Sequence, residues 1–192
     1  ERFPTLQGEG AWTGHAAWFI RLGGCDVGCA WCDVKESWPT DVHPKADVNT
    51  LVQEAVDSGS LRVVVTGGEP AMHDLGPSTK ALRAAGLATH LETSGAHPVS
   101  GDWDWVTLSP KKFKPCRDEW YNIVDELKIV VVNTHDLTWA EGHASKLPQG
   151  TAQFLQPEWD RREEVMERVI ARIHEAPQWR LSLQTHKFIG LP

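Results

Sequence analysis

The sequence predicts an α/β protein built as an incomplete (β/α) barrel, in a single domain over residues 1–192. Short apolar runs alternate with helix-like stretches, which is the order expected of parallel βα units. Several connections between these runs are too short for a full helix, and this disfavours a closed barrel. With 192 residues, 41% of them hydrophobic and 23% charged, the chain can bury a core of its own.

Seven runs rich in apolar and β-branched residues are expected to form strands. They span residues 16–22, 61–66, 88–92, 105–108, 126–132, 152–155 and 180–183. Helices are expected at residues 47–57, 78–85 and 161–174. The third helix has one apolar face, made of Val165, Met166, Val169, Ile170 and Ile173. Asp160 and Glu163 form the Asp-x-x-Glu pattern of a capping box at its start.

Charge and hydropathy narrow the classes of partner. The chain has 19 Lys and Arg residues against 26 Asp and Glu residues, a net charge of −7, which argues against a nucleic-acid partner. No stretch approaches the ~18 uncharged apolar residues of a membrane span, so no membrane partner is expected. The chain opens without a basic and apolar leader, and we expect a cytoplasmic protein. The absence of an initiator Met indicates that a few native residues precede Glu1.

Five of the ten tryptophans are expected in the core or an interface rather than beside a cofactor, because large aromatic rings are most often buried for packing. These are Trp103, Trp105, Trp120, Trp139 and Trp179.

Five polar motifs directly follow predicted strands. They are Thr66-Gly67-Gly68-Glu69-Pro70, Glu92-Thr93-Ser94-Gly95, Ser109-Pro110-Lys111, Gln156-Pro157 and Gln184-Thr185-His186-Lys187. The carboxyl ends of the strands in a parallel barrel meet at one mouth, where ligands bind. The sequence therefore predicts one site to which all five motifs contribute.

Three of the four cysteines lie within eight residues, as Cys25-x-x-x-Cys29-x-x-Cys32. Such crowding indicates a ligand set rather than disulfides. Three thiolates on a glycine-bearing loop can wrap one compact iron-sulfur centre and leave one iron open to an outside ligand. A zinc loop completed by His15 or Asp33 is the alternative, with the distant Cys116 as a further candidate for the fourth ligand.

The cysteine spacing, with the aromatic Trp31 before the last cysteine, resembles the signature of the radical S-adenosylmethionine family. Gly67-Gly68-Glu69-Pro70 is similar to that family's site for the methionine amino group. The resemblance implies that Cys25, Cys29 and Cys32 hold a 4Fe-4S cluster whose fourth iron chelates S-adenosylmethionine. An electron from the cluster then cleaves the sulfonium bond of the cofactor to give a 5'-deoxyadenosyl radical, and Trp31 can shield the cluster from water.

Within that family the chain is similar to enzymes that act on a pterin, and this resemblance covers nearly its whole length. The similar segments are Leu6-Gln7-Gly8-Glu9-Gly10, Thr13-Gly14, Phe19-Ile20-Arg21, Ser109-Pro110-Lys111, Gln156-Pro157 and residues 184–192. The resemblance implies a homodimeric carbon-nitrogen lyase on a shortened radical S-adenosylmethionine core. It implies conversion of 6-carboxy-5,6,7,8-tetrahydropterin to a 7-deazapurine of the queuosine pathway, with Mg²⁺, loss of ammonia, and an electron donor such as flavodoxin.

The resemblance also implies roles for particular residues. The residues implied to contact the cofactor are Gly68, Glu69, Ser109, Pro110, Lys111, Gln156, Pro157, Glu158 and Trp159. Those implied to face the substrate are Leu6, Gln7, Gly8, Glu9, Arg21, Thr66, His186 and Pro192. No acid or base is assigned, because the radical forms on the cofactor. The family usually has Thr or Ser where this chain has Val34, and valine offers no side-chain oxygen to Mg²⁺.

The chemistry of the residues agrees with several of these roles. The planar fork of Arg21 suits a substrate carboxylate, although a solvated strand arginine is the plainer interpretation. Gln7 and Glu9 can read the amide-like edge of a pterin by paired hydrogen bonds. Glu69, held by Pro70, can accept from an ammonium group.

Two other functions share part of the pattern. An activase that installs a glycyl radical on a partner protein has the same cysteine spacing, but it needs no pterin-reading segment such as Gln7-Gly8-Glu9-Gly10. A non-catalytic iron-sulfur or zinc module leaves Gly67-Gly68-Glu69-Pro70 without a role.

Overall fold

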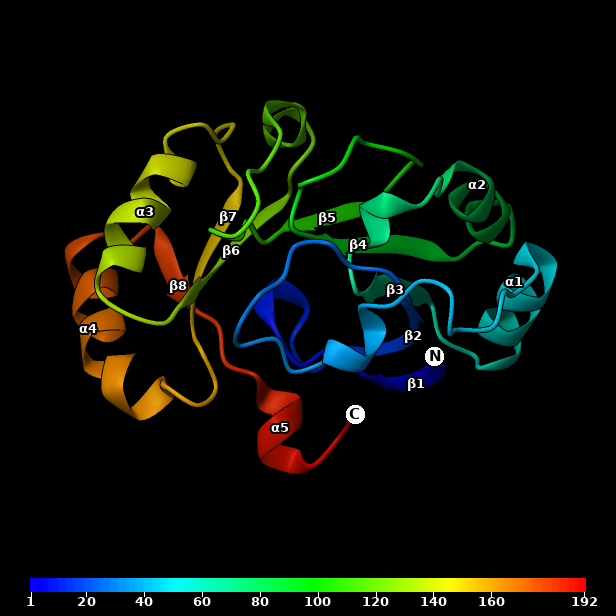
Figure 1. Ribbon diagram of the computed structural model, residues 1–192, viewed down its shortest axis with the longest axis horizontal. Helices are drawn as coiled ribbons and strands as arrows, with labels where there is room; N and C mark the ends of the chain where they lie inside the picture. Colours follow the sequence, from blue (N-terminus) through cyan, green and yellow to red (C-terminus); the bar gives the residue numbers. More distant parts are fainter.

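A computed structural model describes residues 1–192. Its centre is one curved eight-stranded sheet in which the strands are neighbours in chain order, from β1 to β8 (Figure 1). The strands are β1 (Arg2–Leu6), β2 (Ala16–Leu22), β3 (Arg62–Gly67), β4 (Ala88–Thr93), β5 (Trp105–Leu108), β6 (Glu126–Val131), β7 (Ala152–Pro157) and β8 (Trp179–Leu181). Strands β2 to β8 are parallel, and β1 is antiparallel to β2. Because β1 and β8 do not pair, the barrel stays open, which confirms the predicted fold.

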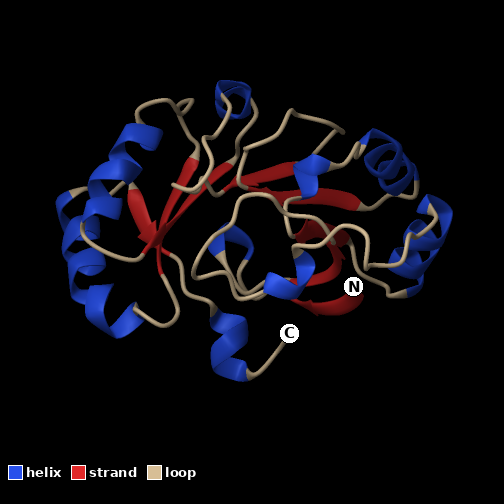
Figure 2. Ribbon diagram, viewed as in Figure 1, coloured by secondary structure: helices blue, strands red, loops and turns tan.

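The five α-helices are α1 (Val48–Asp57), α2 (Gly76–Ala84), α3 (His135–Ala144), α4 (Arg162–Glu175) and the short α5 (Thr185–Ile189). Four of them, α1 to α4, lie outside the curve of the sheet, and the fifth, α5, lies at its open side (Figure 2). No α-helix separates β4 from β5 or β5 from β6, as the short connections predicted. None of the helices is long and apolar enough to cross a lipid bilayer.

The two faces of the sheet differ in chemistry. Outward-facing residues of β2 to β5 pack with α1 and α2, and those of β6 to β8 pack with α3 and α4, in two apolar clusters. On β6 the residues Leu127, Ile129 and Val131 point outward into the core, while Glu126 and Lys128 point inward. Parallel strands covered on both sides are usually apolar throughout. The charged inner face therefore marks the interior of this barrel as a ligand site.

Besides the short α5, two elements were not predicted from the sequence. The first is β1, an edge strand containing Pro4, whose missing N–H is tolerated at an edge. The second is α3, in which only two apolar side chains are buried, those of Leu137 and Ala140. A helix with so small an apolar face gives little periodic signal.

The predicted capping box is wrong. Helix α4 begins at Arg162, and the side chain of Asp160 does not cap it. The carboxylate of Glu158 instead accepts from the backbone N–H groups of Asp160 and Arg161, both at 3.1 Å. The N-cap residue is Arg161, so Asp160 stands one position before the cap and Glu163 is the second helical residue instead of the third, and the two cannot form a capping box.

Four of the five tryptophans expected in the core or an interface lie in or against the apolar core, and Trp105 does not. Trp120 and Trp179 are fully buried in the core, and Trp103 and Trp139 pack against it, as expected. Trp105 lies differently, because its ring centroid is 5.4 Å from that of Trp12, in the segment between β1 and β2.

Candidate active site at the carboxyl ends of the strands

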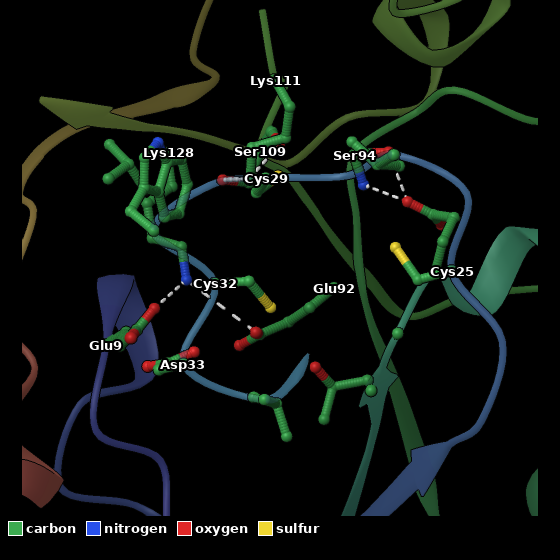
Figure 3. Close-up of a pocket in the computed structure, with 18 of the residues that line it drawn as sticks. Glu9, Cys25, Cys29, Cys32, Asp33, Glu92, Ser94, Ser109, Lys111 and Lys128 are labelled. Atoms are coloured by element: carbon green, nitrogen blue, oxygen red, sulfur yellow. Dashed lines mark hydrogen bonds and ion pairs between the residues drawn. The ribbon is translucent and has the colours of Figure 1, made fainter. Parts of the chain in front are cut away.

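A cavity of about 210 Å³ opens at the carboxyl ends of the parallel strands, between the loop that follows β2 and the strands β3 to β7 (Figure 3). All five polar motifs contribute to its lining, as predicted. From those motifs come Thr66, Gly67, Gly68, Glu69, Glu92, Thr93, Ser94, Ser109, Lys111, Gln156, Gln184 and Lys187. The barrel topology thus gathers residues that are more than 100 positions apart onto one site.

The three clustered cysteines line one side of this cavity, and none of them is in a disulfide. They lie on the loop after β2, where the Cys32 N–H donates to the carbonyl of Cys29 at 3.1 Å. The indole Nε1 of Trp38 donates to the Sγ of Cys32 at 3.4 Å. Burial raises the pKa of the Cys25 thiol, and burial raises that of Cys29 to about 11 despite the opposing charge of Lys111.

The two glycines of Gly67-Gly68-Glu69-Pro70 seat this motif against the cysteine loop. The Gly68 N–H donates to the carbonyl of Leu22 at 3.0 Å, and the Glu69 N–H donates to that of Gly24 at 2.7 Å. A Cβ atom on Gly68 would lie 2.2 Å from the Gly24 carbonyl oxygen and 3.0 Å from the Cβ of Cys25. Only glycine allows this close approach of two backbones.

The donor set fits a multi-iron cluster better than a single zinc ion. The three thiols share one cavity, but no three His, Cys, Asp or Glu side chains converge on one ion-sized point. His15 does not line the cavity, and its ring packs 5.1 Å from that of Trp12. Cys116 also lies outside, with its sulfur beside Gly95. Neither residue can complete a zinc site with the three cysteines, whereas a cluster spreads its ligands over several irons.

Glu69 lines the cavity, but its carboxylate is already occupied. It accepts from the Ala71 N–H at 3.0 Å, from Thr93 Oγ1 at 2.5 Å, and from both the N–H (2.8 Å) and the hydroxyl of Ser94. A carboxylate has about four acceptor positions, so this arrangement leaves none for the ammonium of a cofactor. In this structure Glu69 is therefore a brace between the Gly-Gly turn and the end of β4, and not an open acceptor.

Ser109 and Lys111 form the wall above the cysteines in Figure 3. The Nζ of Lys111 donates to the carbonyl of Ser109 at 2.5 Å and to its hydroxyl at 2.6 Å. It also lies 5.7 Å from the ring centroid of Trp31. Burial lowers the pKa of Lys111. Pro110, between these residues, is not part of the lining.

The end of β7 and the segment that follows it form another side of the cavity. Gln156, Glu158 and Trp159 line the cavity, whereas Pro157 pairs with β6 and does not. The Oε1 of Gln156 accepts from the hydroxyl of Ser182 at 2.8 Å. The ring of Trp159 packs edge-on against that of Phe188 at 5.0 Å, which ties this segment to α5.

The floor of the cavity is a charged network, and the sequence predicts only part of it. The ammonium of Lys128 contacts the carboxylate of Glu9 and lies 3.8 Å from that of Glu92 (Figure 3). Gln7 donates to Glu92 at 2.7 Å, and Gln184 donates to Glu9 at 2.9 Å. The sequence predicts Glu92 at the site, within the motif Glu92-Thr93-Ser94-Gly95, but gives it no role of its own, and it does not single out Lys128. The signal that marks them is charge on strands that are otherwise buried.

The eight residues predicted to face the substrate lie in different places. Glu9 and Thr66 line the cavity, but the other six do not: Leu6, Gln7, Gly8, Arg21, His186 and Pro192. Gln7 acts on the floor through Glu92, and the ring of His186 packs against Gly8. Arg21 is the clearest departure, because its guanidinium donates to Glu1 at 2.6 Å and lies over the ring of Phe3 in the edge strand, not toward the floor.

The C-terminal residue, Pro192, contacts the edge strand β1. The carbonyl of Pro192 accepts a long hydrogen bond, 3.5 Å, from the hydroxyl of Thr5. Val34 and Asp33 line the cavity beside the last cysteine, and Asp33 accepts from Lys187 at 2.5 Å. One of the two carboxylate oxygens of Asp33 is thus paired with α5.

Comparison with known proteins agrees with the fold and with the cysteine loop. The profile of the Radical SAM superfamily matches residues 19–139, which include the cysteine loop and the Gly-Gly turn. The class of protein that the fold and site define is thus a radical S-adenosylmethionine enzyme.

Relatives that align with the whole chain identify a family within this superfamily. The chain is 53% identical to the 7-carboxy-7-deazaguanine synthase of Synechocystis sp. and 48% identical to that of Flavobacterium psychrophilum, each over the whole chain and 91% of the relative. It resembles the crystal structure of QueE from Escherichia coli with a TM-score of 0.85 and 34% identity, over 97% of this chain and 92% of that one. The chain belongs to the 7-carboxy-7-deazaguanine synthase family within the Radical SAM superfamily.

Proposed function

We propose that this protein converts 6-carboxy-5,6,7,8-tetrahydropterin to 7-carboxy-7-deazaguanine with loss of ammonia, as a carbon-nitrogen lyase. One observation carries the proposal. The three cysteines and a floor of hydrogen-bonding acids, Glu9 and Glu92, line the same cavity. A centre for radical chemistry and a site for a polar heterocycle therefore share one space, and the names of the chain-long relatives agree with this pairing.

The residues of the upper part of the cavity fit the cofactors of this family. Cys25, Cys29 and Cys32 would hold a 4Fe-4S cluster. The residues proposed to contact S-adenosylmethionine are Gly68, Glu69, Ser109, Pro110, Lys111, Gln156, Pro157, Glu158 and Trp159. Of these, Glu69, Pro110 and Pro157 would act through the backbone or by shaping neighbours. Cluster and cofactor, when bound, supply the one-electron cleavage that starts the reaction.

The chain itself binds and orients the substrate. The carboxylates of Glu9 and Glu92 can accept from the N–H groups of a pterin, and Thr66 lies beside them in the lining. Trp31, Trp159 and Val34 also line the cavity and reduce the access of water. Holding the ring in one pose and limiting its contact with water is the protein's share of the catalysis.

Arg21 stays a candidate for the substrate carboxylate. On β2 it is the register partner of Thr66, so its Cα lies beside a residue of the cavity wall. We propose that a bound carboxylate competes with Glu1 for its guanidinium, since both are anions that suit the same planar fork.

Two partners complete the proposal. We propose that an electron donor such as flavodoxin reduces the cluster, and that the enzyme works as a homodimer. Chromatography with light scattering on the purified protein tests the second point, for which a mass near twice the 21.4 kDa of the chain is expected.

The experiment that tests the function is an anaerobic assay of the reconstituted protein with S-adenosylmethionine, dithionite and the carboxytetrahydropterin. Mass spectrometry should detect 7-carboxy-7-deazaguanine and ammonia in equal amounts. Cys29→Ala is the matched inactive control. Release of deoxyadenosine with no 7-deazapurine from the active protein would contradict the proposal.

A further inference from the structure

A buried lysine on the cavity floor has no part in the function as proposed above, although its surroundings indicate one. Lys128 lies on β6 with 5% of its side chain exposed, and its ammonium contacts Glu9 and lies 3.8 Å from Glu92. Glu9 comes from the segment between β1 and β2, whereas Glu92 comes from β4. One cation thus joins two acids from separate parts of the chain (Figure 3).

The two acids are more open to a ligand than the lysine is. The side chains of Glu9 and Glu92 are 14% and 20% exposed, and both line the cavity. Besides Lys128, Glu9 accepts from Gln184 and Glu92 accepts from Gln7. Each carboxylate has about four acceptor positions, so these contacts leave positions free on both.

The charges facing Lys128 show what it does for these acids. From its own strand comes Glu126, whose pKa burial raises to about 7, against the pull of Lys128 and of the Ala11 N–H. Burial also acts to raise the pKa of Glu9, but Lys128, with Gln184 and His186, outweighs burial and holds that pKa at about 2.

The lysine in turn depends on the acids. Burial acts to lower the pKa of Lys128, but Glu9, Glu92 and Glu126 outweigh it, and the net shift is upward. The other basic groups near this network are His90 on β4, Lys111, His186 and Lys187, the last of which donates to Gln184 at 3.2 Å. Burial lowers the pKa of His90, Lys111 and His186. The ion pairs with Glu9 and Glu92 are made by Lys128, which is therefore the cation placed between the two acids.

We propose that Lys128 is a positioning residue that keeps Glu9 and Glu92 together as two ionised acceptors for the N–H edge of a pterin. The identity of the ligand rests on the function proposed above. A pterin presents N–H and amino donors on its pyrimidine edge, and an ionised carboxylate is an acceptor only. Two such acids without a cation cannot both stay ionised in a buried site, because like charges drive one of them to take up a proton. A protonated carboxyl would then place an O–H against the N–H donors of the ligand.

The test is the affinity for the carboxytetrahydropterin as a function of pH, measured by anaerobic calorimetry on the reconstituted enzyme without reductant. In the wild-type protein the affinity should be nearly constant from about pH 6 to 8.5, apart from the titration of the ligand itself and a small contribution of Glu126, which titrates near pH 7 but does not line the cavity. In Lys128→Met it should fall roughly 10- to 100-fold near pH 6.5, the size of a lost charge-assisted hydrogen bond, and recover as the pH rises.

Two further variants separate this role from a structural one. Lys128→Arg keeps the charge and should keep a flat profile. The double variant Glu9→Gln with Lys128→Met has one acid fewer and should bind weakly with a flat profile, even if Lys128→Met alone does not fold. Lys80→Met, on the exposed face of α2, is the control for loss of a lysine and should match the wild type. Cluster absorption and S-adenosylmethionine affinity should be unchanged in every variant.

An affinity in Lys128→Met that equals the wild type, or that falls by the same factor at every pH, would overturn the proposal. A pH-dependent profile in Lys128→Arg or in the double variant would overturn it too. Wild-type protein that fails to bind the pterin at any pH would instead overturn the function proposed above, and with it the ligand named for this network.

Discussion

The two sides of the cavity are built in different ways. The cysteine side consists of two chain segments, the loop after β2 and the Gly-Gly turn after β3, which are joined by backbone hydrogen bonds to Leu22 and Gly24. The floor consists of side chains from four distant places, Glu9, Glu92, Lys128 and Gln184, which are joined by charge and side-chain hydrogen bonds. The cysteine side should therefore be sensitive to backbone volume and to its thiols, and the floor to charge and pH.

The largest effect is expected from removing a thiol. Cys29→Ala should abolish iron binding, because Cys29 is one of three ligands that share the cavity. Cys116→Ala is the matched control and should keep about four irons per chain, since Cys116 lies outside. Iron analysis and visible absorption after anaerobic reconstitution measure both. Equal iron in the two variants would remove the distinction drawn between the cysteines.

The next effect concerns backbone volume on the cysteine side. Gly68→Ala should sharply reduce iron incorporation and destabilise the protein by about 2 kcal/mol or more, because its Cβ would meet the rigid Gly24 carbonyl at 2.2 Å. Gly142→Ala, within α3, has no atom within 4 Å of the added Cβ and should stabilise the protein by about 0.5–1 kcal/mol. Urea unfolding and iron content, measured on both, test this contrast. Similar behaviour of the two variants would show that the close approach is not required.

The floor should respond to pH through Glu126. Its pKa of about 7 lies above the ordinary value, chiefly because of burial, so the folded protein binds this proton more tightly than the unfolded chain does. The resulting stability is present below about pH 4.5 and is lost as the pH rises through about 7. Wild-type protein should lose up to about 3 kcal/mol relative to Glu126→Gln over this interval. Parallel urea titrations at pH 5 and 8 measure the difference, and identical pH dependence in both proteins would contradict the assignment.

The smallest effect is expected where the two sides meet, at Val34. Because valine offers no side-chain oxygen where the family usually has a hydroxyl, we expect Mg²⁺ to be held by substrate and water alone. Turnover should depend only weakly on Mg²⁺ after chelation, and Val34→Thr should depend on it more. Titration of Mg²⁺ into both proteins under anaerobic conditions measures this. Full loss of wild-type activity on chelation, restored by Mg²⁺, would show that other groups replace the missing hydroxyl.

The motif around Glu69 predicts the position of this residue but not the contacts of its carboxylate. The motif places this residue at the cavity, which the structure bears out, but the direction of its carboxylate depends on Thr93 and Ser94 of another strand. Arg21 is similar, since its partner Glu1 directly precedes the neighbouring edge strand β1. In both cases the residue type was informative, and its partner was not encoded nearby in the chain.

The sequence by itself determined the βα order, the open barrel and the cysteine side of the site. These depend on hydrophobic periodicity and on residues that are neighbours in the chain, so local patterns are sufficient to predict them. Only the tertiary structure decided that Lys128 stands between Glu9 and Glu92, that the carboxylate of Glu69 is fully occupied, and that His15 and Cys116 lie away from the cavity. Which charges face one another inside a barrel depends on strand register and curvature, and these arise from packing summed over the whole sheet.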